Sequence, residues 1–411
     1  MMTNRIRLEE HQERDVMLSL PELTAIRQLL ARKLEVWPTG EPGRYRLKAG
    51  SHVGFVVMPG GRTLVIEPKV SSIETIFALL AAVYDPSQDF FHDAPQSYTT
   101  VEDLFEFVVR IFVTHVEDLI ARGIVRGYRQ LTDDLVAIRG RLLFSETLRH
   151  RAALRDRHWC AHTHFTADVD ENRILRWTAF CLRGYRYHEP QLPARLRRVG
   201  LGLAEVVIDP EARRLFERLQ FHRLNDPYRP ALALARLVLD HLTFSGAAGG
   251  EPFLAYLVDM NWLFEKYLGA VLRRAAARWG LSLHEQREVK LDLHNRVPVK
   301  PDAVLYSYDH PLLALDAKYK LAADRSDLYQ MLAYCHALDL PRGVLVHPAT
   351  EAIPQATVLI RGAGQVCVHY LALDLRGDPQ ELACQSRALA DQVEAILMLD
   401  ESPSRADPGC R

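Results

Sequence analysis

The chain has 411 residues, of which 48% are hydrophobic and 25% are charged. These values are ordinary for globular proteins, so a disordered or collagen-like chain is excluded, and the length predicts two or three domains. The 51 basic and 52 acidic side chains nearly cancel, which argues against a general, histone-like attraction to nucleic acid. No apolar run is long enough to span a membrane and the start of the chain lacks a signal-peptide pattern, so we expect a cytoplasmic protein without membrane contact.

A small β-rich unit is expected over residues 1–95. Two apolar segments, GFVVM at 54–58 and TLVIEPK at 63–69, flank a Pro-Gly-Gly turn and predict a β-hairpin. Residues 21–37 begin with a proline and carry leucine and isoleucine at helical spacing. This pattern predicts one amphipathic helix within the β-rich unit.

Helical periodicity is typical of the middle of the chain, residues 96–245. In the segment 101–123 the apolar residues form one stripe, and Gly123 is a natural stop for the helix. Residues 122–229 contain 21 arginines, no lysine and 13 acids, so this part is strongly basic. A face that binds phosphates explains the excess, and so does a general preference for arginine codons, because arginine outnumbers lysine throughout the chain.

Small residues at 245–250 separate the helical middle from a C-terminal α/β part at 250–400. Residues 252–280 predict a long helix between a proline and a glycine. Strand patterns follow at 283–291, 299–307 and 312–320, then a helix at 326–338, strands at 343–348, 357–362 and 365–373, and a helix at 379–397. Residues 401–411 form a polar tail. The sequence therefore predicts an α+β multidomain protein with a β-rich start, a helical middle and an α/β end.

The six cysteines contain no CxxC pair, so they predict neither a disulfide framework nor a zinc ribbon. In HWCAHTH, the residues His158, Cys160, His162 and His164 alternate, and on a strand they would share one face. One strand cannot easily wrap a tetrahedral ion, so we expect a half-buried strand face there instead of a zinc site. The cysteines also do not gather as an iron–sulfur centre requires.

Two acids and a lysine lie on consecutive predicted strands. Asp302 is near the start of one strand, and Asp316 and Lys318 are near the end of the next, where they share a face. A hairpin between these strands brings Asp302 beside the other two. Carboxylates are the hard oxygen ligands that Mg²⁺ prefers, and a lysine next to them can position or help deprotonate a water. A buried Asp–Lys ion pair without a catalytic role explains the same residues.

Three further side chains are candidates for the same site. Gln330 and Tyr334 are four residues apart on the following helix, so both face one side. Glu265 borders an apolar face of the long helix, where a carboxylate needs a partner. Taken singly, Gln330 and Tyr334 are better explained by an ordinary helix surface, and Glu265 by an intrahelical ion pair with a neighbouring basic residue.

In chain order, Glu265, Lys300-Pro301-Asp302, Asp316-Ala317-Lys318 and Gln330-x-x-x-Tyr334 lie on a helix–strand–strand–helix frame. This arrangement resembles the PD-(D/E)XK restriction-endonuclease-like superfamily, in the branch with a QxxxY helix. The segments LFEKYL, VKPDAV, LDAKYK and DLYQMLAY are similar to the McrC family, the nuclease subunits of McrBC-type 5-methylcytosine-dependent restriction systems. LVIEPKV, AIRGRLLFSETLR, DENRILRW and NDPYRPALALARLVL are similar as well, so the resemblance covers most of the chain.

The resemblance implies a DNA endonuclease subunit that works with a McrB-like AAA+ GTPase hexamer. Such a subunit contacts the ring through residues 1–95, stimulates its GTP hydrolysis and cuts methylated double-stranded DNA after translocation. The resemblance also implies Asp302, Asp316 and Glu265 as ligands of Mg²⁺ or Mn²⁺, Lys318 as the catalytic lysine, and Gln330 and Tyr334 as residues that shape the site. The sequence has no GxxxxGK[ST] loop, so we expect no nucleotide on this chain itself. A non-catalytic adaptor that activates the ring and binds DNA, and a stand-alone nuclease, are the alternatives.

Overall fold

The computed structural model describes residues 5–84, 100–151, 157–245, 253–320, 322, 324–350, 356–360 and 365–399. The chain forms two compact units: unit 1 combines Met1–Leu104 with Ala255–Arg411, and unit 2 is Phe105–Leu254. The expected domains at 1–95, 96–245 and 250–400 stay a prediction, and residues 246–250 of the predicted linker and the tail at 401–411 lie outside the described residues. Within the described segments, no helix combines the length and the apolar character that a membrane span requires.

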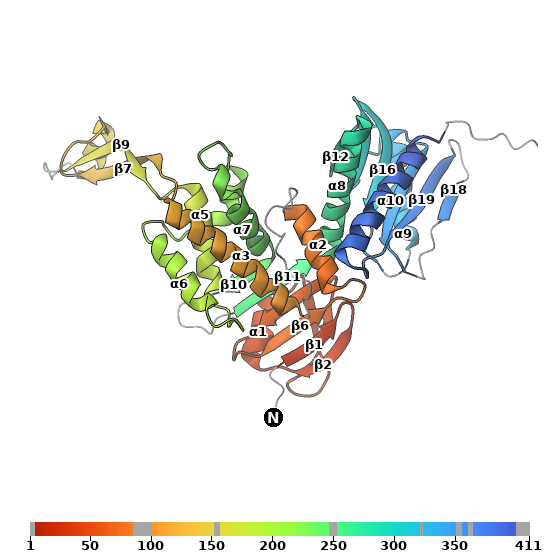
Figure 1. Ribbon diagram of the computed structural model, residues 1–411, viewed down its shortest axis with the longest axis horizontal. Helices are drawn as coiled ribbons and strands as arrows, with labels where there is room; N and C mark the ends of the chain where they lie inside the picture. The colour runs from red at the N-terminus through yellow and green to blue at the C-terminus, as the bar shows by residue number, and fades with distance from the viewer. Residues whose placement is uncertain are drawn as a thin grey trace, which may run out of the picture. The chain divides into compact units, whose positions relative to one another are not determined.

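The N-terminal part of unit 1 contains two small sheets (Figure 1). In the first, β1 (Arg5–Glu9) runs parallel to β6 (Thr63–Glu67), β6 is antiparallel to β5 (His52–Val57), and β5 lies beside β11 (Phe253–Asp259). In the second, β4 (Arg44–Ala49) lies between β2 (Glu13–Met17) and β3 (Leu34–Pro38). The predicted hairpin is confirmed as β5 and β6. A strand from far along the chain, β11, thus lies beside β5 in the first sheet.

Helix α1 (Leu20–Leu29) is shorter than the single helix predicted for 21–37. A capping box between Ser19 and Glu22 begins it, and its buried face includes Leu23 and Ile26. The helix prediction is wrong after residue 29, because residues 30–33 form a turn and residues 34–38 pair with β4 as strand β3. Valine and tryptophan in LEVW favour a strand when a neighbouring strand offers its edge.

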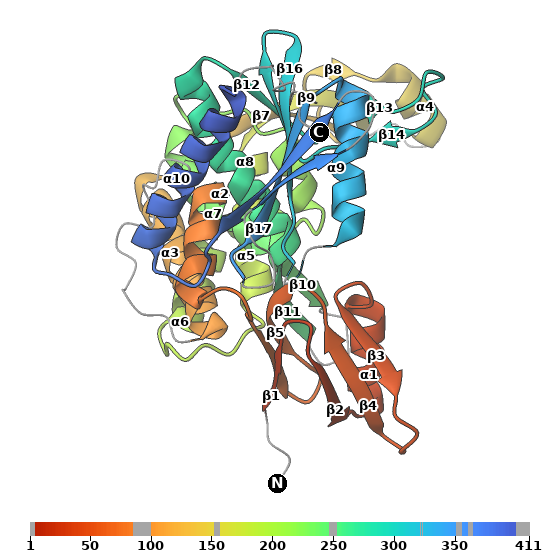
Figure 2. The same ribbon diagram turned by 90° about the vertical axis from the view of Figure 1, so that its right-hand side faces the viewer.

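The C-terminal part of unit 1 is a larger sheet with helices on both faces (Figure 2). Its strands lie in the order β12 (Ser282–Glu285), β15 (Ala303–Ser307), β16 (His310–Ala317), β17 (Arg342–Pro348), β19 (Val366–Leu373) and β18 (Ala356–Ile360). Helix α9 (Arg325–Leu338) covers one face, α8 (Met260–Trp279) and α10 (Pro379–Leu397) cover the other, and α2 (Ile73–Tyr84) packs on α8 and α10. A short antiparallel pair, β13 (Val289–Lys290) and β14 (Pro298–Val299), precedes β15.

Three of the predicted elements in this part are corrected by the structure. The helix predicted for 252–280 is wrong in its first residues, because Phe253–Asp259 is the strand β11 and Asp259 caps α8. Almost every residue of β11 is buried, and a short run that is apolar all round does not distinguish a central strand from a buried helix. The strands predicted for 283–291 and 299–307 are each divided in two, at residues 286–288 and 300–302.

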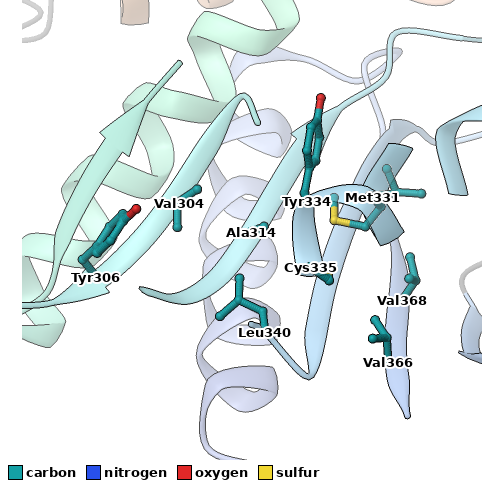
Figure 3. Packing of buried hydrophobic residues seen from close by; sticks show 10 residues of the cluster. Val304, Tyr306, Ala314, Met331, Tyr334, Cys335, Leu340, Val366 and Val368 are labelled. Atoms are coloured by element: carbon teal, nitrogen blue, oxygen red, sulfur yellow. The ribbon is translucent and has the colours of Figure 1, made fainter. Parts of the chain in front are cut away.

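Helix α9 is fixed to the sheet by a cluster of buried side chains. Figure 3 shows Met331, Tyr334 and Cys335 of the helix facing Ala314 of β16 and Val368 of β19. Each of these side chains is almost completely removed from water. Burying aliphatic and aromatic side chains stabilises the contact by about 1.5–3 kcal/mol for each of the larger ones. The cluster therefore holds the polar side chains of α9 in a fixed place relative to β16.

Unit 2 combines helices with a three-stranded sheet, so the expectation of a helical middle is incomplete. Its elements are α3 (Val101–Arg122), β7 (Gly127–Leu135), β8 (Arg141–Leu142), α4 (Phe144–Arg151), β9 (His158–Thr166), α5 (Asp170–Leu182), α6 (Leu192–Gly202), two 3₁₀ turns (Ala212–Glu217 and Asp226–Tyr228), α7 (Arg229–His241) and β10 (Leu242–Ser245). The sheet has the order β7-β9-β8. Inside the unit, Tyr228 accepts a hydrogen bond from the backbone N–H of Val125 and donates one to Asn172. The predicted helix at 101–123 is confirmed as α3.

Candidate active site

The site is built on the antiparallel strands β15 and β16 of unit 1. Their register pairs Ala303 with Leu315, which brings Asp302 opposite Asp316 as the predicted hairpin requires. Asp302 Oδ2 accepts a hydrogen bond of 2.8 Å from the backbone N–H of Ala317. The two carboxylates are therefore held together by the strand pairing and by a backbone hydrogen bond.

Lys318 completes a compact group with the two acids. Its Nζ lies 2.5 Å from Asp316 Oδ2 and donates a hydrogen bond of 2.8 Å to Gln330 Oε1. The backbone N–H of Lys318 donates to the carbonyl of Val346 in β17, which fixes the end of β16. Asp316 is only 1% exposed. A lysine in this position offsets part of the cost of burying that carboxylate.

Burial makes both carboxylates harder to ionise. Burial, together with the neighbouring Asp316 carboxylate, raises the pKa of Asp302 to about 6. Burial also raises the pKa of Asp316, although Lys318 opposes the effect. Asp316 Oδ2 contacts Lys318 as an ion pair but receives no aligned hydrogen bond. Asp302 and Asp316 are close together, and Asp316 Oδ2 accepts no hydrogen bond. Such a pair of carboxylates is suited to binding a cation.

Gln330 and Tyr334 continue a chain of hydrogen bonds from the lysine. Gln330 Nε2 donates to the Tyr334 hydroxyl at 2.6 Å, and this hydroxyl donates to the backbone carbonyl of Lys300 at 3.1 Å. Tyr334 is buried in the α9 cluster, and burial raises its pKa above the ordinary value, so it remains a neutral donor. The predicted pair thus faces the acids from α9, and Gln330 orients the lysine.

Glu265 reaches the group through a residue that sequence reasoning missed. Gln286 Nε2 donates hydrogen bonds of 2.8 Å to both Glu265 Oε1 and Asp302 Oδ1. Lys266 also contacts Glu265 Oε1, at 3.3 Å, so the neighbouring basic residue that the sequence suggested is present too. Gln286 falls inside what looked like one continuous strand at 283–291, and no motif marks it.

The ligand atoms present at the site are of the chemical type that divalent cations prefer. Asp302 and Asp316 supply hard oxygen ligands, and Asp316 Oδ2 is an acceptor without a hydrogen bond. Within the described residues, however, no three histidine, cysteine, aspartate or glutamate side chains are grouped closely enough to hold a metal. Glu265 is joined to Asp302 through the amide of Gln286. Glu265, the predicted third ligand, is therefore connected to the pair of acids only through the side chain of Gln286.

Another buried acid, Glu10, contacts the residue that follows Lys318. Its Oε2 accepts hydrogen bonds from the backbone N–H of Lys69 and from the hydroxyl of Tyr319, the residue after Lys318. Glu10 is 1% exposed, and burial raises its pKa to about 6 from an ordinary value of 4.5. This contact ties the N-terminal sheets to the end of β16.

Glu10→Gln should change how stability depends on pH. The raised pKa means that Glu10 in wild type destabilises the folded state when it ionises, so stability is full below about pH 4.5 and falls as the pH rises through 6. The variant lacks this loss, so its stability relative to wild type should increase by about 2 kcal/mol between pH 4 and pH 8. Urea unfolding across that range measures it. Glu9→Gln, at an exposed neighbouring position, is the control, and parallel curves for wild type and Glu10→Gln would contradict the prediction.

Many arginines of unit 2 form ion pairs with acids of the same unit among the residues that the structure describes. Ion pairs join Arg126 to Glu205, Arg129 and Arg173 to Asp168, Arg157 to Asp134, Arg195 to Glu117 and Arg213 to Asp240. Internal pairing is thus a third explanation for the basic segment. A contact of these arginines with DNA or with a partner stays a prediction.

In HWCAHTH, Cys160 and His162 are buried on β9, and His164 is exposed.

Two solved assemblies contain chains that are similar to this one. A chain of the refined half-complex from a tetradecameric assembly of Thermococcus gammatolerans McrB AAA+ hexamers with bound McrC is similar in fold, with a TM-score of 0.56 and 19% identity over 94% of this chain and 100% of that one. A chain of the cryo-EM structure of the Thermococcus gammatolerans McrBC complex is 21% identical over 66% of this chain and 88% of that one, with a TM-score of 0.40.

A sequence match then defines the family. The family model described as McrBC 5-methylcytosine restriction system component matches residues 47–348, well over half of the chain. The chain belongs to this McrBC family. Among curated proteins there is no significant match.

Proposed function

We propose that this chain is the DNA endonuclease subunit of a McrBC-like, modification-dependent restriction complex, with a PD-(D/E)XK nuclease domain that uses Mg²⁺ or Mn²⁺. The observation that carries the proposal is the group formed by Asp302, Asp316 and Lys318, in which two buried carboxylates lie beside one ammonium. Helix α8, strands β15 and β16, and helix α9 supply these and the flanking residues in the order typical of that superfamily. Membership of the McrBC family supports the same assignment.

Each residue has a separate task in the proposed reaction. Asp302 Oδ1 and Asp316 Oδ2 would hold the cation, while the N–H of Ala317 fixes the other oxygen of Asp302. A bound divalent cation supplies charge that stabilises the phosphate and lowers the pKa of water. Lys318, oriented by Gln330, would position the attacking water and stabilise the negative charge that develops on it as its proton passes to solvent. Tyr334 keeps Gln330 in place and connects it to the backbone before Asp302.

The motor for such a complex would come from a partner. A GxxxxGK[ST] loop is absent from the sequence, and the solved assembly with a similar chain contains McrB AAA+ hexamers with bound McrC. We therefore propose a McrB-like AAA+ GTPase hexamer as the partner and methylated double-stranded DNA as the substrate. In this proposal the chain binds no nucleotide and accelerates GTP hydrolysis by the ring.

A reconstitution with the full chain tests the proposal. The protein is mixed with a McrB-type GTPase, methylated DNA, GTP and Mg²⁺, and each component is omitted in turn. We expect little GTP hydrolysis by the chain alone, faster hydrolysis with the ring, and double-strand cleavage only when every component is present. Stimulated GTP hydrolysis without cleavage under any condition would favour the adaptor. Cleavage by the chain alone, without nucleotide, would favour a stand-alone nuclease.

A further inference from the structure

Gln286 occupies a central place between two acids of the candidate site. A single atom, its Nε2, lies 2.8 Å from Glu265 Oε1 and 2.8 Å from Asp302 Oδ1. Two carboxylate oxygens converging on one point is the arrangement that a bound cation requires. Here the partly positive NH₂ group of an amide fills that point.

The backbone of Gln286 is held in a way that fixes its side chain. The residue follows the last residue of β12 and has φ of +52°, in the left-handed region that side chains other than glycine rarely adopt. Its N–H donates a hydrogen bond of 3.1 Å to the carbonyl of Asp302, so the strained residue is tied to the acid that it contacts. Such strain costs about 1–3 kcal/mol and is characteristic of residues at functional sites.

A primary amide carries an oxygen and an NH₂ group of nearly equal size on the same carbon. Rotation of the amide by half a turn exchanges a hydrogen-bond donor for a hard oxygen ligand and needs little extra space. Without a cation, the two carboxylates favour the NH₂ group. With a cation bound at these acids, repulsion turns the NH₂ group away and the Oε1 atom faces the cation.

We propose that Gln286 is a ligand of the divalent cation and that its amide exchanges Nε2 for Oε1 when the cation binds. The inference rests on the proposed function, since it places the cation at the same acids. Gln286 would then complete the coordination that Asp302, Asp316 and Glu265 begin. It also gives a role to the amide that connects Glu265 to Asp302, where no third acid joins the pair among the described residues.

Metal titration of the full-length protein tests the inference without any cleavage assay. Mn²⁺ alone is the probe, its free concentration is followed by electron paramagnetic resonance, and neither DNA nor partner is added. Gln286→Ala should weaken Mn²⁺ binding by about tenfold or more, as loss of a residue that supports a metal site commonly does. Gln286→Glu, which keeps an oxygen at the same reach and adds charge, should bind at least as tightly as wild type.

Two variants separate the metal role from the fold. Gln286→Gly removes the side chain but adopts a positive φ without strain, so the protein should stay folded and should still lose Mn²⁺ affinity. Gln385→Ala removes an amide of α10 that bonds the backbone of Asp374, and it should bind Mn²⁺ normally.

The direction of the change in affinity decides the question. If Gln286 only competes with the cation for the carboxylates, Gln286→Ala and Gln286→Gly will bind Mn²⁺ as tightly as wild type or more tightly, and the inference is overturned. Asp316→Asn is titrated in parallel. Weak binding by Asp316→Asn together with normal binding by the Gln286 variants rejects the inference alone, whereas normal binding by Asp316→Asn rejects the proposed metal site as well.

Discussion

Asp316→Asn and Lys318→Ala should each lower DNA cleavage by the assembled complex about 10²–10⁴-fold or more, because loss of a metal ligand's charge or of the ammonium removes several kcal/mol of transition-state stabilisation. The first change removes the charge of a buried candidate ligand, and the second removes the ammonium that lies 2.5 Å from it. Both leave the apolar packing of β16 intact, so the fold should persist. Stimulation of GTP hydrolysis is assigned to another part of the chain and should be unchanged. Timed cleavage of methylated DNA and a phosphate-release assay on the same samples measure both activities.

A matched surface variant shows whether loss of cleavage is specific. Arg376→Ala removes an exposed basic side chain that pairs with Asp374, outside both the candidate site and residues 1–95, and it should cut DNA at the wild-type rate. Circular dichroism and thermal unfolding check that the variants are folded. If folded Asp316→Asn and Lys318→Ala proteins both cut DNA at nearly normal rates, the active site lies elsewhere in the protein.

Gly54→Ala should destabilise unit 1 by about 3–5 kcal/mol, because overpacking and backbone strain act together. Gly54 lies in β5 with φ of +150°, and an added Cβ would overlap the backbone carbonyl of Tyr256 in β11. A backbone carbonyl in the middle of a paired strand cannot move aside as a flexible side chain can. Either β11 separates from β5 or the strained residue distorts both strands. Chemical unfolding of the full chain, followed by tryptophan fluorescence, measures the loss.

Gly60→Ala is the natural comparison for this variant. Gly60 also has a positive φ, of +85°, but it lies in the β5–β6 turn and an added Cβ would meet nothing within 4 Å. Its substitution should therefore cost only the backbone strain, about 1–2 kcal/mol. Equal losses for Gly54→Ala and Gly60→Ala would mean that close approach of β11 is unimportant for stability.

Much of the candidate site was accessible to sequence reasoning because its spacing is local. Asp316 and Lys318 are two residues apart on a strand, Gln330 and Tyr334 are four apart on a helix, and a short turn brings Asp302 opposite Asp316. These periodicities follow from backbone geometry alone. The structure agrees with each of these placements, while the catalytic roles stay proposals.

The contacts that sequence reasoning missed depend on tertiary structure. Gln286 has a left-handed backbone conformation, and the sequence has no glycine or asparagine at this position to indicate it. In the sequence, Glu10 is one of several charged residues in a polar segment, and nothing marks it as buried. Only the fold shows that it is buried and contacts Tyr319. Strand β11 was assigned to a helix because its residues are apolar on every side. In each case the deciding partner lies far away in the sequence.

The position of β11 in the first sheet also has a consequence for biosynthesis. Unit 2 is continuous in the chain, whereas unit 1 is made of two segments that unit 2 separates. As the chain leaves the ribosome, β5 and β6 emerge early, but β11 follows only after almost all of unit 2 has been made. Until then the edge of β5 that β11 will cover offers unpaired N–H and C=O groups to other chains. The nascent protein should therefore depend on chaperones most during translation of unit 2, and slow translation there should increase aggregation.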